Sequence, residues 1–178
     1  MQIEALQERD WAQVKQIYLE AFPKSEQKPF SSLKRGVKKG KLEIYAAKEG
    51  DMLLGFTVVI PYGDQVMVDY LAVNQRLRSR GTGSRILQQV CRRFSDKAVV
   101  LLIEELDEQA ANYAQRVARR KFYMKNGFRS ADLHPQINGS AMEVLVWGKP
   151  VTRQGYLNLQ KHALGTLFYH LARIRLGT

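Results

Sequence analysis

Apolar positions along the chain follow helical spacing in some segments and form short strand-like runs in others. After Asp10, which with Gln13 resembles a capping box, the helical spacing is carried by Trp11, Val14, Tyr18, Ala21 and Phe22. A polar break bracketed by Pro23 and Pro29 ends this first helix. The basic segment that follows predicts a short second helix and a loop.

Strand-like runs and helices then alternate. Runs over 44–48 and 52–60 flank a Glu-Gly-Asp turn and predict a hairpin, and a third run over 66–73 leads into an amphipathic helix over 83–94. A short apolar run over 98–103 is most economically parallel to the third run, through a right-handed crossover. A basic helix and two closing strands are expected over 112–126, 128–131 and 141–147. This order predicts an α/β (α+β) fold with a mixed sheet and helices on its faces.

The segment after Pro150 carries one more apolar stripe. Its members are Tyr156, Leu159 or Gln160, Leu164, Leu167, Phe168, Leu171 and Ile174. We therefore expect a domain over 1–150 and an extension over 151–178 that forms one long amphipathic helix. Packing against its own domain is the simplest role for this helix, and a homodimer contact or a membrane surface is the alternative.

A glycine-containing loop, Arg78-Ser79-Arg80-Gly81-Thr82-Gly83, lies between the third strand and the helix that follows it. Glycines let the backbone approach an anion closely, the start of a helix offers unpaired N–H donors, and arginines add charge. Neither the dinucleotide fingerprint nor the nucleotide-triphosphate loop is present, because the spacing is G-x-G without a third glycine or a following lysine. The loop predicts a ligand that bears phosphate.

A second segment, over 121–128, reads as a helix end with an aromatic pair, an Asn-Gly stop and a new strand. Together the two segments resemble the GNAT superfamily of N-acetyltransferases. The acyl-CoA signature R/Q-x-x-G-x-G/A is matched by Arg78, Gly81 and Gly83, and the later F-Y-x-x-x-G-F segment is matched by Phe122, Tyr123, Gly127 and Phe128. The resemblance implies the GNAT fold, in which a mostly antiparallel sheet has splayed central strands, with acetyl-CoA as co-substrate.

The chain departs from the family pattern at two places. Gln75 stands where a proline is common after the strand, and Arg116 stands seven residues before Tyr123, where the family often has a cofactor-contacting asparagine. Asn112 lies one helical turn earlier and substitutes for that asparagine at best in part. Neither departure removes the glycine loop.

The resemblance also implies roles for individual residues. The backbone of the strand end would bind the pantetheine arm, and the loop would cradle the pyrophosphate; these cofactor-binding residues are Leu71, Ala72, Val73, Arg78, Ser79, Arg80, Gly81, Thr82, Gly83 and Ser84. Tyr123 is the expected general acid. Glu104 and Glu105 close the strand over 98–103, and either could take the proton as general base, directly or through a water. Glu104 is the preferred residue, Asp69 on the preceding strand is the second candidate, and pairing with a local arginine is the alternative role of each carboxylate.

Three histidines, His134, His162 and His170, lie outside these motifs and lack metal-ligand spacing, so we expect no metal. Cys91 is expected to be a small core residue. Because it is the only cysteine of the chain, no intramolecular disulfide can form. The longest apolar run, Ala98 to Ile103, is far shorter than the ~20 residues of a membrane span. No signal segment is recognised, and we expect a cytoplasmic protein.

The net charge of +11 exceeds what one anionic cofactor needs. By resemblance, the first two helices and the closing hairpin shape the acceptor side. The lysine-rich segment from Lys24 to Lys41 lies in that region and favours an acidic or neutral small amine, or a protein amino terminus with acidic neighbours, as the acceptor. Two other interpretations stay open: a CoA-binding regulatory module without catalysis, and a basic protein associated with ribosomes or nucleic acid.

Overall fold

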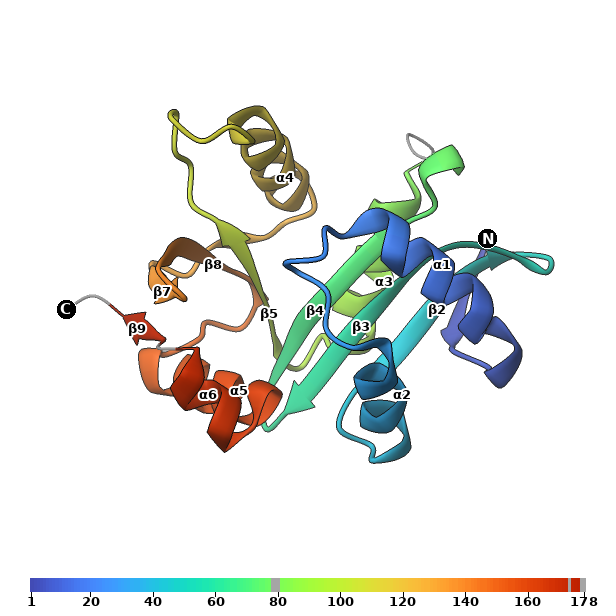
Figure 1. The fold of residues 1–178 in the computed structure, drawn as a ribbon, viewed down its shortest axis with the longest axis horizontal. Helices are drawn as coiled ribbons and strands as arrows, with labels where there is room; N and C mark the ends of the chain where they lie inside the picture. The colour runs from blue at the N-terminus through green and yellow to red at the C-terminus, as the bar shows by residue number, and fades with distance from the viewer. Residues whose placement is uncertain (78–80, 173, 177–178) are drawn as a thin grey trace. The chain divides into compact units, whose positions relative to one another are not determined.

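The computed structural model describes residues 1–77, 81–172 and 174–176 (Figure 1). The chain forms two compact units, one made of Met1–Pro61 with Val68–Arg93 and the other of Tyr62–Met67 with Phe94–Thr178. Strand β4 (Gln65–Val73) contributes to both units. The expected division at residue 150 stays a prediction.

The first unit contains the elements predicted for the amino-terminal half of the sequence and three that were not predicted, namely the first strand and two 3-10 turns. They are β1 (Gln2–Ala5), the 3-10 turn η1 (Glu8–Asp10), α1 (Trp11–Ala21), α2 (Phe30–Lys38), β2 (Glu43–Glu49), β3 (Met52–Tyr62), most of β4, the 3-10 turn η2 (Gln75–Leu77) and α3 (Thr82–Arg93). The strands are ordered β1-β2-β3-β4, with α1 and α2 in front of the sheet and α3 behind it in Figure 1. On the α3 side, Ile86 packs with Ala47 and Leu54.

Cys91 lies in the buried face of α3, as expected. Desolvation by burial raises the pKa of its thiol to about 12. Cys91 is therefore a packing residue, with almost no reactive thiolate at neutral pH.

A buried ion pair joins the start of α1 to the sheet. The Nζ of Lys48 on β2 lies 2.6 Å from a carboxylate oxygen of Asp10, and both side chains are buried. Glu4 on β1 adds a second, more exposed contact at 3.1 Å. Burial pulls the pKa of Asp10 upward, but the hydrogen bonds from Lys48 and from the Gln7 backbone outweigh it, and the net pKa is below its usual value.

The second unit is built around a long antiparallel pair. Its elements are β5 (Ala98–Glu104), α4 (Tyr113–Lys125), β6 (Arg129–Ser130), β7 (Pro135–Ile137), β8 (Ser140–Gly148), α5 (Arg153–Leu164), α6 (Thr166–Leu171) and β9 (Arg175–Leu176). Strand β5 pairs with β8 along its whole length, and β8 also pairs with β6 and β7. The mixed, mostly antiparallel sheet expected from the sequence is thereby confirmed.

The parallel ladder between β4 and β5 is short. It joins Gln65, Val66 and Met67 to Ala98, Val99 and Val100. Both strands continue beyond this ladder, β4 to Val73 and β5 to Glu104. The pairing given for these two strands therefore covers only their amino-terminal ends.

The expectation of one long helix after residue 150 is wrong. Gly165 adopts φ +78° and separates α5 from α6, because a left-handed residue ends a right-handed helix. Tyr156 and Leu159 of α5 are fully buried, whereas Leu167, Phe168 and Leu171 of α6 are exposed. The apolar stripe thus contributes to the core only through its first half.

Replacement of Asp10 by Asn is expected to lower the free energy of unfolding by about 3 kcal/mol, because Lys48 would stay buried without its principal counterion. Since the native pKa of Asp10 is lowered, its contribution is present above the unfolded value near 3.8 and is lost as pH falls through the native pKa. Urea unfolding at several pH values measures both effects. Glu4→Gln, which removes only the exposed contact, is the control, with an expected loss below about 1 kcal/mol; equal losses for both variants would contradict the prediction.

Candidate functional site

The end of β4 is packed tightly against its neighbour β3. A Cβ on Gly55 would lie 2.6 Å from the carbonyl oxygen of Ala72 and 3.2 Å from the Cα of Val73. The N–H of Asn74 donates to the Leu54 carbonyl at 2.9 Å, which anchors the chain where the strand ends. The predicted pantetheine-binding backbone is therefore held in a fixed position within the first unit.

The loop after β4 delivers the chain to α3 in the conformation that a glycine allows. Gly81 has φ +72°, and its carbonyl accepts the N–H of Arg85 at 3.0 Å, so the helix begins directly after it. The backbone amides of Thr82, Gly83 and Ser84 belong to the first turn of α3 and lie at the positive end of its helix dipole. Arg78, Ser79 and Arg80, predicted to bind phosphate, lie outside the described residues.

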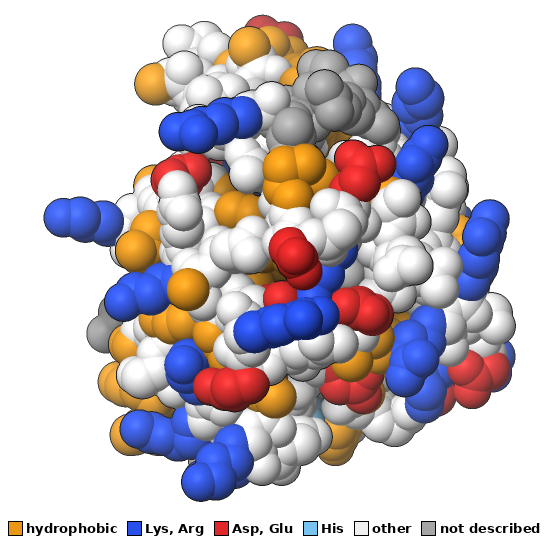
Figure 2. All heavy atoms as spheres, turned by 90° about the vertical axis from the view of Figure 1, so that its right-hand side faces the viewer, with side chains coloured by type: hydrophobic (Ala, Val, Ile, Leu, Met, Phe, Trp, Pro, Cys, Tyr) orange, Lys and Arg blue, Asp and Glu red, His pale blue; other side chains and the backbone are white. Residues whose placement is uncertain are grey.

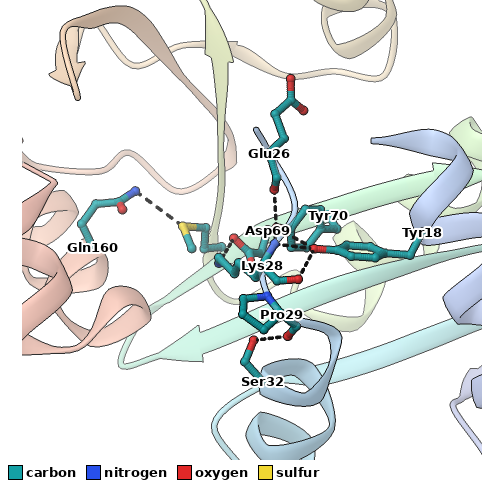
Figure 3. A network of polar contacts seen from close by, with 9 residues as sticks. Tyr18, Glu26, Lys28, Pro29, Ser32, Asp69, Tyr70 and Gln160 are labelled. Atoms are coloured by element: carbon teal, nitrogen blue, oxygen red, sulfur yellow. Dashed lines mark hydrogen bonds and ion pairs between the residues drawn. The ribbon is translucent and has the colours of Figure 1, made fainter. Parts of the chain in front are cut away.

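A hydrogen-bond network ties the segment between α1 and α2 to β4 (Figure 3). The hydroxyls of Tyr18 and Tyr70 lie 3.2 Å apart, and the backbone N–H of Lys28 donates to both. Tyr70 donates in turn to the carbonyl of Glu26 at 2.8 Å. Burial first, then the bond from Tyr18 and the charge of Asp69, raises the pKa of Tyr70 well above its usual value, so this network is neutral.

Asp69, the second candidate base, is engaged in an ion pair. Its two oxygens lie 2.8 and 2.6 Å from the Nζ of Lys28, which is drawn beside it in Figure 3. Asp69 is mostly buried, and Lys28 is more than one-third exposed. Here the contact agrees with the structural role that the sequence left open, although the cation is a lysine and not an arginine.

In the second unit, Tyr123 lies on α4 within an aromatic group. Its ring centroid is 5.1 Å from that of Phe122 and 5.8 Å from that of Phe128. Desolvation by burial raises the pKa of the phenol to about 12, against a smaller lowering by the charge of Arg119. Tyr123 therefore keeps its proton at neutral pH, as a proton donor must.

The helix that carries Tyr123 ends as the second motif predicts. Gly127 has φ +85°, its N–H donates to the Met124 carbonyl, and the N–H of Phe128 donates to the carbonyl of Tyr123 at 3.2 Å. The glycine is thus required by the backbone, since a left-handed residue is strained for other amino acids. The motif therefore fixes the position of Tyr123 near the end of α4 relative to the strand that follows.

Glu104, the predicted base, closes β5 and is clamped by three side chains. Arg116 lies 3.1 Å from one carboxylate oxygen and Arg119 3.3 Å from the other, and the amide of Asn112 donates to both. The contacts favour a positioning role for Glu104, while its role as base stays a prediction. Arg116 and Asn112, the residues of the family departure, both belong to this clamp.

Two further side-chain pairs, those of Glu143 and Glu105, were not predicted from the sequence, although Glu105 itself was considered as a base. Glu143 on β8 is buried and accepts hydrogen bonds from Arg120 at 2.8 and 3.1 Å. Glu105 lies 2.6 Å from Nδ1 of His134, in the segment before β7. The partners are 23 and 29 residues apart, and only the doubled glutamate at 104–105 marked this position in the sequence.

In the part of the chain that the structure describes, no group of three His, Cys, Asp or Glu residues is arranged to hold a metal, and no helix is long and apolar enough to cross a membrane. Figure 2 shows lysine and arginine side chains spread over one face, with acidic side chains among them. A small pocket in the first unit adjoins the end of β4 and is lined by Gln13, Gln16, Ile17, Glu20, Leu53, Asn74 and Arg76.

Comparison with known proteins identifies both a family and a fold. The family model of the acetyltransferase (GNAT) domain matches residues 40–130, just over half of the chain. No curated protein sequence matches significantly. The match spans β2 to β6 and includes the glycine loop, Glu104 and Tyr123.

Solved structures agree with this result at the level of the fold. A GNAT-family protein from Bacteroides thetaiotaomicron shares 21% identity with a TM-score of 0.76, over 95% of this chain and 98% of its own. An aminoglycoside 6'-N-acetyltransferase complexed with coenzyme A shares 18% identity with a TM-score of 0.67, over 83% of this chain and 96% of its own. The ribosomal-protein-S18-alanine N-acetyltransferase from Escherichia coli shares 14% identity with a TM-score of 0.64, over 82% of this chain and 91% of its own.

The Tyr123 phenol is expected to stay protonated when unperturbed tyrosines, with a pKa near 10, have ionised. Carbon NMR of protein labelled at tyrosine Cζ measures this, with Tyr123→Phe to assign the signal. The Tyr123 resonance should not move below about pH 11. An ionisation midpoint near pH 10 would contradict the burial argument.

Proposed function

Because the chain belongs to the acetyltransferase (GNAT) domain family, we propose that it transfers an acetyl group from acetyl-CoA to a primary amine of a small molecule or a protein. The observation that carries this proposal is the left-handed Gly81 between the end of β4 and the first turn of α3. Backbone amides in that arrangement bind the pyrophosphate of a nucleotide-like carrier.

The proposed cofactor contacts follow the chain from β4 into α3. Backbone groups of Leu71, Ala72 and Val73 hold the pantetheine arm and orient the thioester, because a peptide-like arm can pair with an extended strand end. Amides from Arg78 to Ser84 hold the pyrophosphate, and the arginines of this segment add charge-assisted hydrogen bonds. The tight packing at Gly55 supports this assignment, since it fixes the strand end against which the arm lies.

The proposed chemistry is direct transfer assisted by a general acid. The amine attacks the thioester carbonyl carbon, the C–S bond breaks, and the thiolate takes a proton from the phenol of Tyr123. The raised pKa of Tyr123 supports the role, since the phenol is fully protonated before the reaction. Glu104 holds Arg116 and Arg119 in place at the end of β5.

For the acceptor we propose an acidic or neutral amine in place of a polycation. Lys28 and Lys41 lie in the segment expected to shape the acceptor side. Desolvation by burial, and to a smaller extent the charges of Lys28 and Lys39, lower the pKa of Lys41, while the charge of Asp69 opposes this shift. Like charges disfavour a polyamine there. Two fold neighbours are named as an aminoglycoside 6'-N-acetyltransferase and a ribosomal-protein-S18-alanine N-acetyltransferase, so the fold alone does not select the acceptor, and the proposal rests on the local lysines.

Gly81→Ala is expected to weaken acetyl-CoA binding at least about tenfold, because an L side chain at φ +72° strains the turn that presents the amides. Isothermal titration calorimetry at low salt measures the Kd for acetyl-CoA. Gly40→Ala is the matched control, since Gly40 has φ +64° and equally open surroundings but lies between α2 and β2. Equal affinity of Gly81→Ala and wild type for acetyl-CoA would contradict the proposal that the backbone around Gly81 binds the pyrophosphate.

Turnover across a panel of acidic, neutral and polycationic amines tests the reaction, with release of free CoA thiol as the readout. We expect Tyr123→Phe to lower kcat about 100-fold for the best amine without changing the Kd for acetyl-CoA, whereas Tyr113→Phe on the same helix should have little effect. Binding without turnover for every amine would favour a regulatory module. Equal turnover of spermidine and acidic or neutral amines would contradict the proposed acceptor class.

A further inference from the structure

Glu105, which directly follows Glu104 in the chain, forms a carboxylate–imidazole pair with His134. The Oε1 of Glu105 lies 2.6 Å from Nδ1 of His134, and 53% of the His134 side chain and 34% of the Glu105 side chain are exposed. Glu105 directly follows the last residue of β5, and its N–H donates to the Ala141 carbonyl at 3.1 Å. The pair is therefore attached to β5 and β8 of the second unit.

The two adjacent glutamates, Glu104 and Glu105, differ in the side chains that they contact, and only the partner of Glu105 can exchange a proton readily. Glu104 is held by two guanidinium groups that are permanently charged. Glu105 instead contacts a histidine, the side chain that most readily exchanges a proton near neutral pH. A carboxylate on Nδ1 fixes the tautomer in which Nδ1 carries the hydrogen and the lone pair is on Nε2.

We propose that His134 is the general base that deprotonates the acceptor amine, and that Glu105 is the residue that positions its imidazole. This inference rests on the proposed acetyl transfer and concerns the same site. It replaces Glu104 as the base and retains Tyr123 as the acid.

Protons and electrons balance in the resulting sequence. The acceptor enters as an ammonium ion and gives one proton to Nε2 of His134, and the freed lone pair forms the C–N bond. The C–S bond breaks with its electron pair on sulfur, and the thiolate takes the phenol proton of Tyr123. A second proton leaves the new amide nitrogen and restores the phenol through solvent. The imidazolium then releases its proton to water, so the products are the acetylated amine, CoA thiol and one proton.

The charged groups around the pair come from three elements. Glu105 follows β5, Glu143 is on β8, and Arg120 on α4 is paired with Glu143. Burial pulls the pKa of Glu143 upward, but hydrogen bonds from Arg120 and Ser130 outweigh it, and the charge of His134 adds to the net lowering. Glu143 thus stays a carboxylate near His134 and helps to stabilise the imidazolium that forms during turnover.

One test needs no acceptor. In long-range 1H–15N NMR spectra of the full chain, His134→Gln assigns the His134 signals among the three histidines. The neutral ring is expected in the tautomer with hydrogen on Nδ1, and Glu105→Ala should remove that preference. A neutral ring with hydrogen on Nε2 would overturn the dyad, since no lone pair would face the amine.

The kinetic test uses the best amine of the panel. His134→Gln should lower kcat at least about 100-fold while the Kd for acetyl-CoA, measured by calorimetry, stays unchanged. Glu105→Gln should lower kcat less and move the acid limb of the kcat–pH profile to lower pH, because the imidazolium loses a neighbouring negative charge. A purely structural Glu105 would leave that limb in place. His170→Gln, on the exposed face of α6, is the matched control.

The outcomes separate this inference from the proposed function. Wild-type turnover with unchanged kcat in His134→Gln would overturn the dyad and leave the acetyltransferase intact. Loss of acetyl-CoA binding in His134→Gln would also count against the dyad, because the histidine would then act on folding or on the cofactor. A wild type without turnover for any amine would overturn both.

Discussion

The end of strand β4 depends on the absence of a side chain at Gly55. Any Cβ there would collide with the carbonyl of Ala72, which is backbone and has no rotamer to move to. Close contact between β3 and β4 sets where the strand stops, and therefore where the glycine loop begins and how α3 starts. A cofactor that is bound mainly by main-chain groups needs this accuracy, because backbone cannot adjust to a misplaced ligand as a long side chain can.

Carboxylates in both units follow one electrostatic pattern. Asp10, Asp69, Glu104 and Glu143 each contact a lysine or an arginine at short range. The acidic residues at these sites are thus committed to local pairs, and the excess positive charge of the chain is carried by other side chains. Glu105 differs because its partner is a histidine, whose charge can change during a reaction cycle. The type of partner, a histidine for Glu105 and two arginines for Glu104, is therefore what distinguishes these adjacent glutamates.

Long elements with a clear period were predictable from the sequence. Helices α1, α3 and α4 and strands β2 to β5 have apolar spacing and start or stop residues of the expected kind. Strands β1, β7 and β9 have two to four residues, too few to show alternation, and they form only because a neighbouring strand offers hydrogen bonds. The break at Gly165 was missed because the apolar stripe continues on both sides of it. Tyr123 and Gly81 were found through motifs, whereas contact between Glu105 and His134 arises from chain folding and leaves no local signal.

The buried position of Cys91 affects how acetyl transfer can be measured by thiol release. Acetyl transfer from a thioester liberates one sulfhydryl per turnover, and chromogenic disulfides that count such groups also react with accessible protein thiols. Here the single cysteine is enclosed in α3 and its pKa is raised to about 12. The folded protein should therefore contribute almost no background colour, and slow appearance of a sulfhydryl without substrate would report unfolding.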